Sequence, residues 1–224
     1  MVITLLAACD RLTKPTSSGR PYEVLVVVDD QLWQRPAGRA LFDVLDTDVP
    51  GLPQPERSFR ISQTTQKRFS QVLNIFRTII KVDIDPTQYT QTKMKFTRDV
   101  YARPQVVLTI QSPNEKDFAA FVKKNSRSII DFLVKVEMNR QINELEEKHS
   151  EAVSQLAEEI FKCQLWAPAE IKSYKKGKDF FWASSNTASG LVNICMYSYP
   201  YEGPRTFNKQ YVLAKRDSVM KANI

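Results

Sequence analysis

A cysteine near the N-terminus carries the most specific chemical signal in the sequence. Leu6-Ala7-Ala8-Cys9 places an apolar residue and two small residues before a cysteine, which is the pattern of a bacterial lipobox. Signal peptidases need small side chains before the cut, and a cysteine thiol can accept a diacylglyceryl group. We therefore expect Cys9 to be the lipidated N-terminus of the mature protein, which would reach the membrane through this lipid anchor.

Residues 1–21 are predicted to be a truncated lipoprotein signal followed by a tether. The segment from Arg11 to Pro21 is polar and rich in Ser, Thr, Lys and Pro, which suits a tether. Only Met1 to Leu6 precede the small residues, and none of them is basic, so we expect the natural start to lie upstream. The alternative interpretation makes Val2 to Ala8 a short buried strand and Cys9 a core thiol.

Two adjacent carboxylates follow the first apolar run of the sequence. Tyr22 to Val28 is apolar and β-branched, which indicates a central strand, and Asp29 and Asp30 come directly after it. Enzymes with α/β folds often place acids at such a strand end. With an acid from residues 43–48, they form the only pair that could serve a carboxylate-based hydrolase. The interpretation we favour is a polar strand exit in which Asp30 caps the next helix.

A second group of candidate residues lies in the segment from Ile171 to Asn186. Lys175, Lys176, Lys178 and Trp182 form a candidate ligand surface, because lysines interleaved with aromatic rings can bind glycans, lipids or nucleic acid. A β-hairpin with one buried aromatic face and lysines outside gives the same pattern, and we favour that interpretation. The hairpin is expected to turn near Lys176-Gly177.

The sequence lacks the residues that most other kinds of catalytic or metal site require. The chain has one histidine, His149, and its three cysteines form no C-x-x-C pair. Nucleotide-binding glycine motifs and the G-x-S-x-G serine motif are absent from the sequence. We predict no catalytic residue, no metal site and no cofactor. Cys163 and Cys195 could form one disulfide, but we favour the interpretation that they are two separate buried thiols.

The net charge of +7 does not by itself indicate a nucleic-acid binder. The basic excess lies in residues 51–112 and 164–224, which we expect to be largely strand, and no recognition motif accompanies it. Net charge affects solubility and loose attraction more than specific binding. Nucleic acid is therefore not an expected partner.

The elements that must position these residues indicate an α+β fold. The order strand–helix–strand–strand occurs twice, from residue 22 and from residue 105, and two ferredoxin-like halves would explain it. We expect a mostly antiparallel sheet, with a first half over 22–104 and a second half over 105–224. The second half is expected to lack a further C-terminal portion.

One very long helix is predicted from Ser112 to about Phe161. Ser112-Pro113-Asn114-Glu115 is a typical helix start, and no proline or glycine follows until Pro168. An apolar stripe at helical spacing should be mostly buried, with Phe121, Ile129, Leu133 and Leu156 among its members. His149 lies on the same stripe, so we expect its ring against apolar side chains or at the stripe's edge.

Four stretches of the sequence resemble a known family. GRPYEVLVVVDDQLW, DVLDTDVPGLPQPERSF, GKDFFWASSN and RDSVMKANI are similar to an uncharacterised lipoprotein family of the Bacteroidetes that is described only as a domain of unknown function. The resemblance covers residues 20–224 and implies a lipid-anchored protein of the cell envelope, on its periplasmic or outer-membrane face. It implies no catalytic residue. Our first hypothesis is a non-enzymatic binding or assembly module whose partner is an envelope protein or a glycan. The alternative is a carboxylate-based hydrolase that acts on envelope or dietary glycans.

Overall fold

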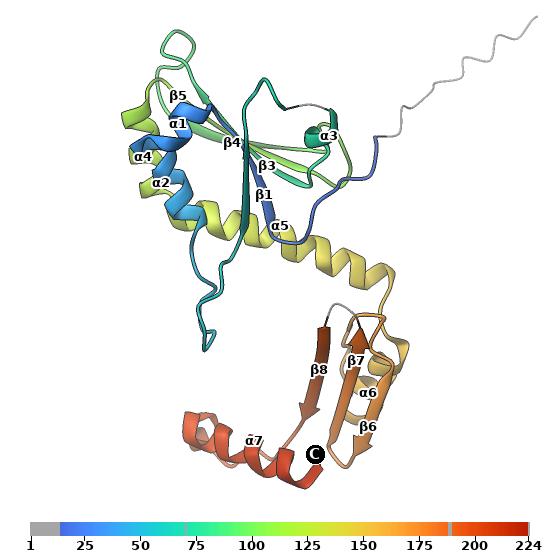
Figure 1. Ribbon diagram of the computed structural model, residues 1–224. Helices are drawn as coiled ribbons and strands as arrows, with labels where there is room; N and C mark the ends of the chain where they lie inside the picture. Colours follow the sequence, from blue (N-terminus) through green and yellow to red (C-terminus); the bar gives the residue numbers. More distant parts are fainter. Residues whose placement is uncertain (1–13, 70, 188–189, 224) are drawn as a thin grey trace, which may run out of the picture. The chain divides into compact units, whose positions relative to one another are not determined.

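The computed structural model describes residues 14–69, 71–187 and 190–223, which form two compact units divided between Arg140 and Gln141 (Figure 1). Each unit has its own sheet and its own apolar core. The sequence predicted a boundary between residues 104 and 105. The structure instead keeps β5 (Val106–Ser112) in the first unit, because this strand pairs along its length with β3 and β4.

The sheet of the first unit is mixed and mainly parallel. Its strands are β1 (Glu23–Val27), β2 (Arg60–Thr64), β3 (Thr78–Ile84), β4 (Lys93–Arg98) and β5, in the order β2-β1-β3-β5-β4. Only the β4–β5 pair is antiparallel. The expected antiparallel sheet and ferredoxin-like half are therefore wrong here. The apolar run in β1 is explained by burial on both faces of a parallel sheet.

Helices cover one face of this sheet. They are α1 (Asp30–Gln34), α2 (Pro36–Leu45), α4 (Glu115–Lys124) and α5 (Ser126–Glu147). Arg35 separates α1 from α2, because Pro36 cannot donate a helical hydrogen bond and starts a new helix. Fully buried residues of this face include Val26, Leu41, Ile80, Leu108, Phe118 and Ile129.

The opposite face has a smaller core. Leu25, Val27, Ile79 and Val107 are buried there. Phe69, Leu73, Phe76, Val100 and Tyr101 pack against them, and the short helix α3 (Gln71–Asn74) belongs to the same side. The first unit therefore buries side chains on both faces of its sheet.

The predicted long helix is three helices. α4, α5 and α6 (Glu151–Phe161) replace it, and the longest, α5, has 22 residues. Asn114 caps α4 by accepting from the Asp117 N–H at 2.8 Å, whereas Ser112 is the last residue of β5 and fully buried. Asn125 and Ser150 stand at the breaks, and such side chains compete with helical backbone bonds. Ile129, Leu133 and Leu156 are buried as predicted, but Phe121 is only half-buried.

A buried ionic cluster fixes α5 to the start of β3. The Glu137 carboxylate lies 2.8 Å from Arg77 Nη2 and 2.9 Å from Arg140 Nη1, with 3% of the glutamate side chain exposed. Arg140 also donates to Thr78 Oγ1 at 2.7 Å and to the Arg77 carbonyl. Burial lowers the pKa of Arg140 from its ordinary value, and the Glu137 charge opposes that shift. One face of α5 is therefore held firmly.

The end of the predicted tether packs on the first unit. The Ser17 N–H donates to the Arg103 carbonyl at 3.1 Å, and the Ser18 N–H donates to the Ile75 carbonyl at 2.8 Å. Arg77 N–H donates in return to the Ser18 carbonyl at 2.8 Å. These bonds hold in place a segment that we expected to be a free tether. The predicted lipidation site, Cys9, lies outside the described residues.

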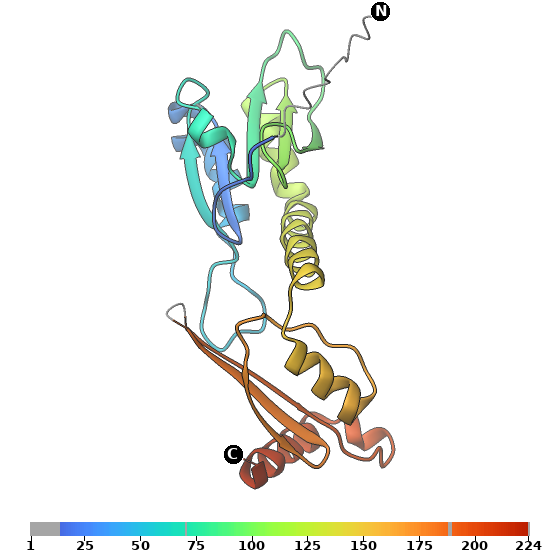
Figure 2. The same cartoon turned by 90° about the vertical axis from the view of Figure 1, so that its right-hand side faces the viewer.

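The second unit is an antiparallel sheet with a helix on one face. β6 (Ser173–Gly177), β7 (Phe180–Thr187) and β8 (Gly190–Tyr197) lie in the order β6-β7-β8, and β6 and β7 form the predicted hairpin. The helix α6 lies beside this sheet (Figure 2). Its residues Val153, Leu156 and Ala157 pack with Phe181 and Ala183 of β7. A 3-10 turn, η1 (Pro204–Phe207), precedes α7 (Lys209–Asn223), which has no buried residue among those described. None of the helices in the described parts of the chain combines the length and apolar character needed to cross a bilayer.

Candidate ligand-binding groove

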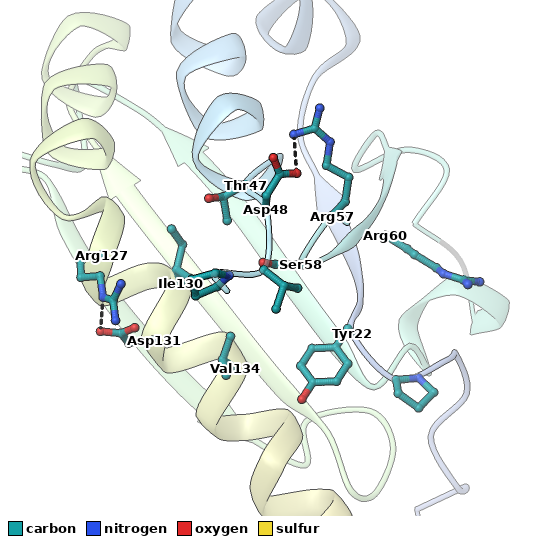
Figure 3. Close-up of a pocket in the computed structure, with 13 residues that line it drawn as sticks. Tyr22, Thr47, Asp48, Arg57, Ser58, Arg60, Arg127, Ile130, Asp131 and Val134 are labelled. Atoms are coloured by element: carbon teal, nitrogen blue, oxygen red, sulfur yellow. Dashed lines mark hydrogen bonds and ion pairs between the residues drawn. The ribbon is translucent and has the colours of Figure 1, made fainter. Parts of the chain in front are cut away.

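A groove of about 720 Å³ lies in the first unit, between α5 and the proline-rich loop that joins α2 to β2 (Figure 3). The side chains of Tyr22, Ile130 and Val134 stand around it, and Val49 and Pro50 add apolar surface from the loop. Arginine–aspartate pairs line it on both the loop side and the helix side. The volume falls in the range of small-molecule and side-chain pockets.

The loop side is shaped by residues that forbid a regular element. The loop contains four residues that prevent a regular helix or strand, Pro50, Gly51, Pro53 and Pro55. Its two arms nevertheless run antiparallel to each other, with Asp48 opposite Arg57. The Val49 N–H donates to the Glu56 carbonyl at 2.8 Å, and the Ser58 N–H donates to the Thr47 carbonyl at 2.8 Å. The loop is therefore held in one shape at its base.

Arg57 ties these two arms together electrostatically. Its guanidinium lies 3.0 Å from Asp48 Oδ1 and 3.2 Å from Asp46 Oδ1, and it donates to the Asp46 carbonyl at 3.0 Å. The arginine is about half exposed, so these pairs are screened by water and contribute modestly to stability. Their main effect is to orient the charged side chains on the loop side of the groove.

The helix side of the groove comes from a second face of α5. Arg127, Ile130, Asp131 and Val134 have the i, i+3, i+4, i+7 spacing that places residues on one helical face. Arg127 Nε lies 2.9 Å from Asp131 Oδ2. Because the buried face of α5 is formed by Ile129, Leu133 and the Glu137 cluster, Ile130 and Val134 remain half-buried and available to a ligand.

Tyr22 enters the groove from an unusual backbone conformation. Its φ is +59°, in the left-handed region that non-glycine residues other than Asn and Asp rarely adopt. The Arg60 N–H donates to the Tyr22 carbonyl at 2.9 Å and helps to hold this geometry just before β1. Backbone strain of this kind is concentrated at functional sites.

The groove offers apolar contact and paired charges. Asp48 and Asp131 are its carboxylates, and each already faces an arginine. Arg60 also lines the groove, with its guanidinium pointing away from the other labelled side chains in Figure 3. Such a lining can bind an apolar segment that carries polar or charged ends, and it provides no carboxylate free of an arginine partner for acid–base work.

The predicted acids Asp29 and Asp30 lie elsewhere, at the carboxyl end of β1. Asp29, rather than Asp30, is the helix cap, because its carboxylate accepts from the N–H groups of Gln31 and Leu32. Asp30 accepts from Gln63 Nε2 at 3.0 Å and pairs with Arg68 Nη2 at 2.5 Å. Neither residue lines the groove.

The acids of residues 43–48, which were candidates to pair with Asp29 or Asp30, also lie close to arginines. Asp43 lies 4.0 Å from Arg39, and Asp46 and Asp48 are held by Arg57. The geometry therefore assigns these carboxylates to a helix cap and to ion pairs.

The lysines of the predicted ligand surface are exposed on the hairpin of the second unit. Lys176 pairs with Glu159 of α6, and Lys175 donates to the Asn223 carbonyl of α7. Lys178 is exposed at the turn, and half-buried Trp182 donates to Asn193 Oδ1 at 2.9 Å. Phe180 and Phe181 are buried, so this segment has the buried aromatic side chains and exterior lysines that we favoured.

Two of the remaining candidates for reactive chemistry, His149 and Cys163, line one pocket of the second unit together with Ser154 and Glu158. Cys163 and Cys195 are free thiols, half-buried and exposed respectively, which corrects the expectation that both are buried. Partial burial raises the pKa of Cys195 from its ordinary value. The His149 ring stacks on Trp166 at 5.8 Å, and its Nδ1 lies 2.9 Å from the Leu145 carbonyl oxygen. Within the described residues, no three His, Cys, Asp or Glu side chains are placed to hold a metal ion.

These features define a two-unit α+β protein with a mixed sheet, an antiparallel sheet and a groove beside α5. The chain belongs to the family of a domain of unknown function, DUF8532, which matches residues 17–146. A second domain of unknown function, DUF4837, matches residues 150–224. No curated protein and no solved structure matches the chain. The two matched ranges meet close to the division between the two units.

Proposed function

We propose that the protein is a lipid-anchored, non-enzymatic binding module of the cell envelope, and that the groove of its first unit holds the ligand. The observation that carries the proposal is the lining of the groove. Apolar side chains of α5 and the loop surround it, and its two carboxylates are each paired with an arginine. A hydrolase that works through carboxylates needs one of them as an acid and the other as a base or nucleophile.

The groove fits an apolar segment of a protein partner or a small amphipathic ligand. Ile130 and Val134 supply an apolar strip one helical turn long, and Tyr22 and Val49 supply the facing surface. Both sides are held before a ligand arrives, the helix by its buried face and the loop by Arg57. A pre-organised site loses less conformational entropy on binding.

The anchor part of the proposal rests on the sequence around Cys9 and on the polar residues that follow it. The packed segment begins at Pro15, so only a few residues separate Cys9 from the first unit. A chain acylated at Cys9 would hold this unit close to the bilayer surface. Labelling cells with a fatty-acid analogue, with the gene carrying its upstream start, tests this. Label on the parent but not on Cys9→Ala supports the anchor, and equal label on both contradicts it.

An apolar dye tests the groove itself. Anilinonaphthalene sulfonate combines aromatic rings with an anionic group and fluoresces when bound to apolar surface. We expect Val134→Asp to weaken dye binding by the groove about tenfold, because it places a charge among apolar side chains. Met138→Asp is the matched control on the same helix, since Met138 is 49% exposed and does not line the groove.

A second variant guards against loss of folding. Val134→Trp fills the groove instead of charging it and should also block the dye, while circular dichroism and the unfolding temperature confirm that the chain folds. If the dye binds both folded Val134 variants as strongly as the parent, the groove is not a ligand site.

A further inference from the structure

An exposed pair of aromatic rings stands out on the second unit, in the segment that joins β8 to α7. Tyr201 is 63% exposed and Phe207 is 78% exposed. Their ring centroids are 5.5 Å apart and the ring planes are 31° from parallel. Single exposed apolar residues are ordinary, but two exposed rings that contact each other form a continuous apolar surface. We refer to Tyr201 and Phe207 together as the aromatic platform.

The turn between the two rings is closed by hydrogen bonds. Thr206 is buried, and its Oγ1 accepts from the Glu202 N–H at 3.0 Å. Its own N–H donates to the Gly203 carbonyl at 2.9 Å. Gly203 has a φ of +107°, which a residue with a side chain rarely adopts. The platform is therefore positioned by its own turn and needs little ordering when a ligand arrives.

Cations lie in and beside the same turn. Arg205 is in η1, two residues before Phe207, and Lys209 begins α7, two residues after it. In the described parts of the chain, neither side chain has a hydrogen-bond or ion-pair partner. The nearest acid in the sequence, Glu202, accepts from the Tyr211 hydroxyl at 3.0 Å. The platform is thus flanked by positive charge that remains available to a ligand.

We infer that the aromatic platform, with Arg205 and Lys209, binds an acidic polysaccharide. The C–H face of a sugar ring can lie on the exposed aromatic rings, and a uronic-acid carboxylate can accept hydrogen bonds from the arginine and the lysine. An acidic rather than a neutral sugar is favoured because the two cations have no partner in the described residues. A nucleic acid is the competing ligand, because a base can also stack on an exposed aromatic ring, and binding to an oligonucleotide is therefore measured alongside. This site is independent of the groove.

Affinity electrophoresis of the full chain in gels that contain polygalacturonate tests the inference. We expect retardation by polygalacturonate and not by dextran, a neutral polymer. Phe207→Ala and Tyr201→Ala should each weaken the retardation about tenfold, and Arg205→Gln should reduce its dependence on salt, with Lys209 supplying the remainder. Tyr174→Ala is the matched control, because Tyr174 is also an exposed aromatic residue, 58% exposed, but lies on the hairpin.

Loss of binding can be distinguished from loss of folding, because the substituted side chains are on the surface. Unchanged circular dichroism and unfolding temperatures in the four variants will show that loss of binding is local. No retardation by polygalacturonate, or equal retardation by dextran, would overturn the inference. Tighter binding to single-stranded oligothymidylate that is lost in the same variants would also overturn it and assign the platform to nucleic acid.

Discussion

The two units differ in how completely their sheets are covered. The first unit buries apolar side chains on both faces of its sheet, with helices on one face and loops and α3 on the other. The core cluster of the second unit lies between α6 and one face of a three-stranded sheet, Phe180 is buried on the other face, and the described residues of α7 contribute nothing buried. Apolar burial is the main stabilising contribution to folding, so the first unit should be the more stable one.

The same difference separates the two proposed binding surfaces. In the first unit, ligand contact is limited to a groove that the fold leaves between a helix and a loop. In the second unit, large apolar side chains such as Tyr201, Phe207 and Leu191 stand openly on the surface. The proposed site of the first unit is thus a groove, and that of the second unit is an open surface.

The largest expected effect is the removal of a core ring from the first unit. Phe118 is fully buried among the helices and the sheet, so Phe118→Ala should reduce the free energy of unfolding by about 3–5 kcal/mol. Phe207→Ala in the second unit removes the same atoms from an exposed position and should change it by less than about 0.5 kcal/mol. Urea denaturation with separate probes for each unit measures both. Similar losses for the two variants would mean that the contrast in burial is false.

Removing the charge of a buried ion pair should destabilise the protein more than removing the charge of an exposed one. Glu137→Gln removes the carboxylate charge that faces Arg77 and Arg140 in a buried site, and we expect a loss of about 3 kcal/mol. Glu115→Gln makes the same chemical change in an exposed pair with Arg35 and should cost less than about 1 kcal/mol. Thermal unfolding of the two variants distinguishes these cases. An effect of Glu137→Gln no larger than that of Glu115→Gln would show that the cluster does not hold α5.

Removing a helix cap should destabilise the protein by a smaller amount, and only in the unit that contains the helix. Ser150 caps α6 and its hydroxyl donates to the Ile171 carbonyl at 2.6 Å, so Ser150→Ala should cost about 1–2 kcal/mol. Asn114→Ala removes the cap of α4 at a cost of about 1 kcal/mol. Hydrogen exchange should show faster exchange in α6 alone for the first variant and in α4 alone for the second. Faster exchange spread over both units would contradict the division between them.

The smallest effect concerns pH. A hydrogen bond from Lys176, together with the lysine's charge, lowers the pKa of the exposed Glu159 carboxyl below its ordinary 4.5. Because the pKa is lower in the folded chain, this pair's small contribution is present above pH 4.5 and is lost as the pH falls through the lowered value. Nuclear magnetic resonance titration of the carboxyl carbon should show this. Lys176→Gln should return the pKa of Glu159 toward 4.5, and an unchanged titration would show that the hydrogen bond is not formed in solution.

Local patterns predicted the elements of the fold better than their assembly. The β-branched run of β1 and the hairpin of β6 and β7 were both predicted from local spacing. Strand direction depends on which segments pair, and that information is spread over residues far apart in the chain. The sequence therefore did not indicate that β5 lies parallel to β3 or that it belongs to the first unit.

The predicted long helix shows that the absence of proline and glycine does not establish one continuous helix. Pro and Gly are absent from Asn114 to Ala167, but Asn125 ends α4 by donating to the Phe121 carbonyl, and Ser150 starts α6 as its N-cap. The groove was missed for a related reason. Ile130 and Val134 flank the buried stripe, and their spacing with Arg127 and Asp131 is a second helical face that could have been recognised. The aromatic platform could have been noticed from Tyr201 to Phe207, where two aromatic residues enclose Gly203 and Pro204.

Site-specific photo-crosslinking in the native host tests the central claim, that the groove of the first unit is where the protein binds its ligand. A benzophenone amino acid at position 134 lies in the groove, and the same group at position 138 lies on an exposed part of α5 outside it. We predict one discrete crosslinked product from position 134, lost when Ile130→Asp is added and absent from position 138. Equal crosslinking from the two positions, or a product from 134 that survives Ile130→Asp in a folded chain, would contradict the proposal.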